Sequence, residues 1–159
     1  MRACCCCVAI GVILGGLAGT ARAEPANLIY AEALGKGGPY GVGYERTITP
    51  RLGIGAVASF AVIRQQQLAT LAPYLHVAIA RSRSRRHAVF GELGLVIVHS
   101  RVPSPVASWD GTSDTGAGGL AAVGYELAGD RVVMRTYLAA ELGEGGLAPW
   151  LGIAIGVRL

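Results

Sequence analysis

The chain has few charged residues and few aromatic residues, and it has no cysteine after position 7. Only 15% of its 159 residues are charged and 6% are aromatic, whereas roughly a quarter of an ordinary soluble domain is charged. Hydrophobic types make up 52%, which excludes an intrinsically disordered chain. The four cysteines are consecutive, at positions 4–7. Adjacent residues cannot all point at one ion, so this run does not predict a metal site.

These cysteines fall inside an N-terminal segment that is organised like a secretory signal. Arg2 supplies the positive start, an apolar stretch runs to Leu17, and residues 21–23 form a small-x-small cleavage site. We therefore expect residues 1–23 to be a cleaved signal peptide and residues 24–159 to form one domain. Cleavage would remove Arg2 and Arg22, so the formal net charge would fall from +4 by two units, to +2. A retained membrane helix is the alternative, but the apolar part is short for the ~20 residues that a span needs.

No later apolar run reaches the ~18 residues of a membrane helix, and what recurs instead is alternation. At the C-terminus, large apolar residues alternate with Gly, Ala and Arg; the large ones are Leu151, Ile153, Ile155, Val157 and Leu159. Residues 52–62 and 132–142 repeat this pattern. Successive side chains of a strand point to opposite faces, so the pattern predicts strands with one bulky apolar face. The 24 glycines show no three-residue period, which excludes collagen.

Turn signals divide the chain into eight predicted strands, at 26–35, 38–47, 50–62, 69–80, 88–99, 116–127, 131–142 and 148–159. Most match the ~9–11 residues of a tilted membrane strand. An even number of antiparallel strands can close without an edge, as a bilayer requires. The sequence therefore predicts an all-β fold, an eight-stranded antiparallel up-and-down transmembrane barrel with its bulky face toward lipid. At Pro73, which cannot donate to a ladder, we expect a bulge or a strand start.

The small residues of the inward face should leave room for a few large side chains, because an eight-stranded barrel is just wide enough to be filled. The candidates are Tyr30, Tyr74, Phe90, Tyr137 and Trp150. Other aromatic residues are candidates for interfacial girdles, namely Tyr40, Tyr44, Tyr125 and Trp109.

With both termini on the periplasmic side, the longest connection, 100–115, should form a surface loop that presents Trp109, Asp110 and Asp114. The basic stretch 81–87 then lies in the periplasm. It is either a solvated turn or a contact for anionic lipid head groups. It has no aromatic platform or reading helix beside it, so we expect no nucleic-acid binding.

Residues 32–46, EALGKGGPYGVGYER, resemble the first hairpin of small bacterial outer-membrane β-barrel proteins, in which a Glu, a glycine-rich turn and a Tyr-Glu-Arg strand end occur together. The resemblance implies an eight-stranded barrel of the OmpA/OmpX size class, located in the outer membrane and in contact with its lipids. It also implies that barrel-assembly machinery reads the C-terminal strand. Such chains usually end in an aromatic residue, whereas this one ends in Leu159.

Alternation places eight ionisable residues inside the barrel: Glu32, Glu45, His76, Glu92, Glu126, Arg135, Glu141 and Arg158. Counting His76 as neutral, the inward balance is 2 − 5 = −3. Because isolated buried ions are very costly, we expect a structural network of ion pairs and water. A cation site, a small-ligand site or a proton relay is the alternative. No metal-ligand spacing, phosphate loop or dinucleotide fingerprint occurs, so we expect no cofactor.

His99 and Ser100, with Glu92, invite comparison with an outer-membrane lipid A deacylase. Adjacent strand residues face opposite ways, however, so the nucleophile and the base would not meet without a bulge or a loop. The sequence therefore favours a non-catalytic integral outer-membrane protein with a structural or surface-interaction role. A small pore, a deacylase-like hydrolase and a soluble periplasmic barrel remain as alternatives.

Overall fold

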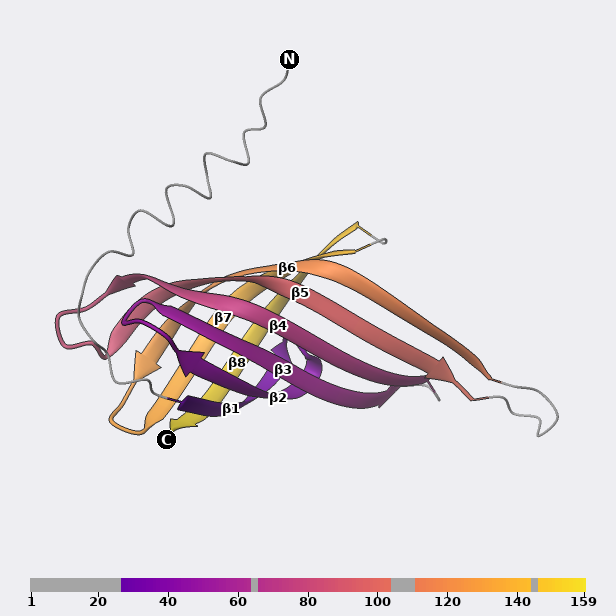
Figure 1. Cartoon of the computed structure of the whole chain (residues 1–159), viewed down its shortest axis with the longest axis horizontal. Helices are drawn as coiled ribbons and strands as arrows, with labels where there is room; N and C mark the ends of the chain where they lie inside the picture. Colours follow the sequence, from indigo (N-terminus) through magenta and orange to yellow (C-terminus); the bar gives the residue numbers. More distant parts are fainter. Residues whose placement is uncertain (1–26, 64–65, 104–110, 144–145) are drawn as a thin grey trace, which may run out of the picture.

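The computed structural model describes residues 27–63, 66–103, 111–143 and 146–159. Within these ranges the chain forms eight strands, each hydrogen-bonded to the next, and β8 closes on β1 to complete the barrel (Figure 1). Their bounds are β1 Asn27–Gly35, β2 Gly38–Thr47, β3 Leu52–Ile63, β4 Gln66–Arg81, β5 His87–Val102, β6 Thr112–Ala128, β7 Val132–Gly143 and β8 Gly146–Arg158. All neighbouring pairs are antiparallel. The predicted fold class is confirmed.

The outer face of the wall is apolar over its whole circumference. Large side chains such as Val42 on β2, Leu93 on β5 and Ile155 on β8 are about half exposed or more. In water this much contiguous apolar surface would drive association, whereas in a bilayer it is solvated by lipid. The alternative of a soluble periplasmic barrel therefore does not fit. No helix of the described ranges is both long and apolar enough to span a membrane.

The interior is filled by the aromatic residues that the alternation predicts. Tyr30, Tyr74, Phe90 and Tyr137 are all buried. Trp150 has the same inward parity, because it pairs with buried Ala139, but it lies near the outer end of β8 and stays 39% exposed.

Glycines opposite the large rings make this filling possible. A Cβ atom at Gly43 would overlap the ring of Tyr30, and one at Gly152 would overlap the ring of Tyr137. At Gly55, a Cβ atom would lie 2.5 Å from the hydroxyl oxygen of Tyr74. The inward glycines are therefore the complement of the inward tyrosines, since a barrel of this width cannot hold two side chains at these heights.

The strands differ from the prediction mainly at their outer ends. β5 runs to Val102 and β6 starts at Thr112, so Asp114 lies within a strand, opposite Ser100, and not in a loop. The expected loop bounds of 100–115 were therefore wrong. A polar stretch can continue an antiparallel ladder past the lipid, where the apolar alternation used to place strand ends is no longer needed. Trp109 and Asp110 lie outside the described residues.

The expectation for Pro73 was also wrong. Pro73 lies in the middle of β4, opposite Ala56 of β3, and the register with β5 is the same before and after it. The register shift of β4 falls instead between Ala78 and Ala80, near the periplasmic end.

The wall is uneven in height. β1 and β2 have 9 and 10 residues, whereas β4, β5 and β6 have 16, 16 and 17. Figure 1 shows β5 and β6 reaching far beyond the turn between β1 and β2. The β1–β2 turn therefore lies below the outer rim of the wall. From this position Lys36 of the turn reaches the interior network, and the turn forms the floor of the outer cavity, as described below.

Candidate functional site in the barrel interior

The buried ionisable residues come from six strands and one turn. Glu32 is on β1, Glu45 on β2, His76 on β4, Glu92 on β5, Glu126 on β6 and Arg135 on β7, and all six are buried. Strand register sets two of the contacts directly, because His76 pairs with Glu92 across β4 and β5, and Glu126 pairs with Arg135 across β6 and β7. Directly opposed residues on one face of an antiparallel pair have Cβ atoms about 5 Å apart, within reach of such side chains.

Arg135 joins opposite walls of the barrel. Its Nη1 and Nη2 donate to Oε2 and Oε1 of Glu45 at 2.7 and 2.9 Å, and its Nε donates to Oε2 of Glu126 at 2.9 Å. The planar guanidinium matches a carboxylate in this two-point geometry, which a lysine could not reproduce. Arg158 reaches the other oxygen of Glu126 at 3.4 Å from the periplasmic end, where its side chain is 36% exposed. One arginine thus holds β2, β6 and β7 together.

Lys36 is the second buried cation, and sequence reasoning missed it. Its Nζ lies 2.8 Å from Oε2 of Glu92 and 3.6 Å from Oε2 of Glu32. It also lies over the rings of Tyr137 and Tyr74, at 4.2 and 4.7 Å from their centroids. Lys36 belongs to the glycine-rich turn between β1 and β2, which a sequence reader takes as solvent-exposed. The available signal was the inward charge deficit of −3, which called for a further cation.

Tyrosine hydroxyls complete the network around the carboxylates. The hydroxyl of Tyr74 donates to Oε2 of Glu45 at 3.0 Å and is hydrogen-bonded to the hydroxyl of Tyr30 at 2.6 Å. The hydroxyl of Tyr137 donates to Oε2 of Glu32 at 2.6 Å. The other oxygen of Glu32 accepts the backbone N–H of Gly37 at 2.7 Å. Among the described residues, no buried side-chain nitrogen or oxygen lacks a hydrogen-bond partner. The interior therefore meets the condition for a stable buried polar network.

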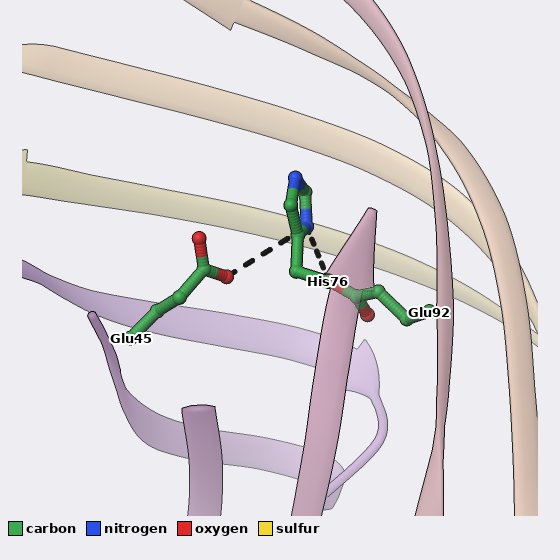
Figure 2. A group of neighbouring side chains, drawn as sticks. All are labelled: Glu45, His76 and Glu92. Carbon is green, nitrogen blue, oxygen red and sulfur yellow. Dashed lines mark hydrogen bonds and ion pairs between the residues drawn. The ribbon is translucent and has the colours of Figure 1, made fainter. Parts of the chain in front are cut away.

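Figure 2 shows His76 between the carboxylates of Glu45 and Glu92. Its Nδ1 is 3.1 Å from Oε1 of Glu92 and 3.7 Å from Oε2 of Glu45, and its ring stacks on Phe90 at 4.8 Å between centroids. Among the described residues, four buried glutamates face two fully buried permanent cations, Lys36 and Arg135.

Glu45, His76 and Glu92 also have the spacing of a metal site, because one ligand atom from each lies within 4.8 Å of the others. The two carboxylates are already occupied, however. Both oxygens of Glu45 accept from Arg135, and the oxygens of Glu92 face Lys36 and His76. A divalent ion would have to displace these cations from Glu45 and Glu92 and break their buried ion pairs, which is costly. The donor set therefore fits an ion-pair network better than a metal centre.

Two of the residues assigned to the interior lie at its ends. Arg158 is at the periplasmic mouth, bonded to Glu126 as described above. Glu141 is half-buried near the outer end, where it lines a cavity together with Trp150. Neither is part of the fully buried centre.

The deacylase-like arrangement is not assembled. His99 is exposed and its Nδ1 lies 2.8 Å from the hydroxyl of Thr115, while Ser100 has the opposite parity and pairs with Asp114. Glu92 lies seven residues before His99 on β5, which is about 23 Å at the usual rise of a strand. Its Oε2 accepts a hydrogen bond from Lys36. Within the described ranges, His99 is bonded to Thr115 and not to Ser100, so the His-Ser-Glu set that this comparison requires does not come together.

The remaining candidates lie on the surface. Tyr40, Tyr44 and Tyr125 are exposed on the outer face, as the girdle interpretation expects. The basic stretch forms the turn between β4 and β5, and its arginines Arg83, Arg85 and Arg86 are exposed.

No family model and no curated protein matches this sequence. Solved structures do match. The N-terminal β-barrel domain of OprF from Pseudomonas aeruginosa aligns with a TM-score of 0.57 at 12% identity, over 85% of this chain and 96% of that one. Ail, the attachment invasion locus protein of Yersinia pestis, aligns with a TM-score of 0.54 at 10% identity, over 85% of this chain and 97% of that one. Neisserial surface protein A aligns with a TM-score of 0.55 at 9% identity, over 85% of this chain and 94% of that one.

The fold is that of the small outer-membrane β-barrels. At these identities the alignments concern the fold alone. With the apolar outer surface, the fold places the protein in the outer membrane, in contact with its lipids.

The buried position of Lys36 leads to a stability prediction. Lys36→Met should lower the free energy of unfolding by about 3–5 kcal/mol, because it leaves buried Glu92 and Glu32 without their shared cation. Arg131→Met, a matched change at an exposed position, should shift it by less than about 0.5 kcal/mol. Urea unfolding in lipid vesicles, followed by heat-modifiable gel mobility, measures both. Equal stability of the two variants would contradict the role assigned to Lys36.

Proposed function

We propose that the protein is a non-catalytic integral outer-membrane barrel with a structural or surface-interaction role. The observation that carries this proposal is the sealed interior. Arg135 and Lys36 bridge opposite walls, and the space left at the periplasmic mouth is about 20 Å³, room for roughly one water molecule. A continuous aqueous path through this centre would require the ion pairs to open. Structural or contact roles need no such opening.

The outer end supports a contact role more than the interior does. β5 and β6 form the tallest part of the wall, and their outer ends carry polar residues on both faces, from Thr112 to Thr115 on β6. One solved structure of Ail is a complex with the heparin analogue sucrose octasulfate. The described part of the tip carries one cation, Arg101, and one anion, Asp114, on opposite faces of the β5–β6 hairpin. This balance of charge does not favour a polyanion as the partner.

Conductance measurements separate this proposal from a small pore. Purified monomer in planar bilayers should give no stable single-channel steps at neutral pH, because the interior network closes the lumen. Vesicles containing the protein should likewise retain an entrapped small dye as well as protein-free vesicles do. Large, stable steps from the monomer would overturn the sealed-barrel proposal.

Orientation and surface display can be tested with introduced cysteines, since residues 8–159 contain none. Ser113 lies at the outer tip of β6, and Ser84 lies in the β4–β5 turn at the other end; both are exposed. On intact cells a membrane-impermeant maleimide should label Ser113→Cys and not Ser84→Cys. After the outer membrane is permeabilised, both should be labelled. The reverse pattern would contradict the orientation, and labelling of both in a detergent-free soluble fraction would contradict the membrane location.

We also propose that the C-terminal strand is read by barrel-assembly machinery. β8 pairs with β1 through Ile153, Ile155 and Val157, so it is the strand that closes the barrel. Its apolar outward residues support this proposal.

A further inference from the structure

The outer part of the wall has a lateral gap. β2 pairs with β3 as far out as Val42 opposite Ala58, and β1 pairs with β8 as far out as Ala33 opposite Ile153. Beyond these points β1 and β2 pair only with each other, up to Gly35 opposite Gly38. Of the described residues, those of β3 from Ser59 outward and of β8 from Gly152 outward have no strand partner on this side. The barrel is therefore closed in its periplasmic part and open between β3 and β8 above the β1–β2 turn.

The gap exists because the β1–β2 turn bends into the lumen. Gly35, Lys36 and Gly37 are buried, and the side chain of Lys36 is anchored by Glu92 and Glu32 as described above. Ser59 of β3 donates its hydroxyl to the carbonyl of Gly37. A Cβ atom at Gly37 would lie 2.9 Å from a methyl carbon of Val57, so a larger residue here would force Val57 or the turn to shift. The turn thus forms a floor instead of a section of wall.

A cavity of about 220 Å³ lies above this floor. Its walls are largely apolar, in contrast to the ionic centre below, and include Ala61, Ile63, Leu68, Val96, Val98 and Trp150. The polar residues of the lining are Lys36 at the floor, Ser59, Thr70 and Glu141. Apolar cavities of about 150 Å³ stay dry and bind molecules the size of benzene. A space of this size therefore suits a short stretch of hydrocarbon better than water.

The cavity adjoins the gap. Its lining includes Ala61 and Ile63 from β3, Trp150 from β8, and Gly38 and Pro39 from the hairpin between them. The strand edges that flank the gap carry exposed apolar residues, Phe60 and Val62 on β3 and Leu147 and Leu151 on β8. The apolar side chains in contact with lipid thus continue along both strand edges as far as the apolar part of the cavity wall.

We propose that this outer cavity holds the end of an acyl chain from a lipid of the surrounding membrane, which enters sideways through the gap between β3 and β8. The chain gains burial on apolar walls, and its polar head stays at the interface outside. The proposal depends on the membrane location of the barrel but not on its structural or contact role. The conductance result therefore does not decide it, whereas recovery of the protein in a detergent-free soluble fraction would remove its premise.

Trp150 makes the proposal measurable. The chain has two tryptophans, Trp109 and Trp150, so a Trp109→Phe background leaves one reporter in the cavity wall. In vesicles whose lipids carry bromine near the ends of their acyl chains, Trp150 fluorescence should be quenched relative to vesicles of the same lipid without bromine. Absence of quenching would overturn the proposal.

A matched pair of variants separates the cavity from the outer surface. Ala61→Phe should fill the cavity and remove most of the quenching, while Ala58→Phe places the same ring on the lipid side of β3 and should leave it unchanged. Val98→Phe is a second filling variant if Ala61→Phe fails to show heat-modifiable mobility. Equal quenching in filled and unfilled proteins would mean that lipid reaches Trp150 from outside, which contradicts the proposal.

The source of the acyl chain is tested separately. In vesicles of unbrominated lipid, a brominated fatty acid added from the external solution at low concentration should produce little quenching. Quenching that occurs only under this condition would make the occupant an external ligand and would overturn the membrane lipid as its source.

Discussion

The structure depends on the compensation of four glutamates buried inside a closed wall. A buried carboxylate without a partner costs several kcal/mol, and here each of the four has at least one cation within 4 Å. Arg135 and Lys36 carry most of this compensation. They approach from different directions, Arg135 from β7 and Lys36 from the turn between β1 and β2, so the ion pairs tie together strands that are not neighbours in the sheet.

The shape of the barrel follows from this requirement. For Lys36 to reach Glu92, the β1–β2 turn must bend inward, and Gly37 allows the bend. The same bend removes the turn from the wall and leaves β3 and β8 without partners at their outer ends. The sealed centre and the open outer cavity are therefore two results of one arrangement. The outer cavity is lined mainly by apolar residues and adjoins the lipid-facing surface, so its chemistry differs from that of the ionic centre.

Period-two alternation predicted the fold and most of the interior, because a strand leaves only two orientations for each side chain. Glu45, His76 and Arg135 could be assigned inward on parity alone. Alternation says nothing about turns, and Lys36 was missed for that reason. The apolar alternation also stops where the wall leaves the lipid, so it indicates a loop where β6 continues as a polar strand through Asp114. The gap between β3 and β8 depends on register between strands distant in sequence, which no local pattern contains.

The central claim is that the Arg135–Glu45 pair holds the interior together, and a double-mutant cycle tests it most directly. Free energies of unfolding would be measured in lipid vesicles for wild type, Arg135→Met, Glu45→Gln and the double variant. If the pair carries the network, the two single changes will not be additive, and the coupling energy will be at least about 1 kcal/mol, within the range seen for residues in one network. Additive effects, with a coupling energy near zero, would contradict the account.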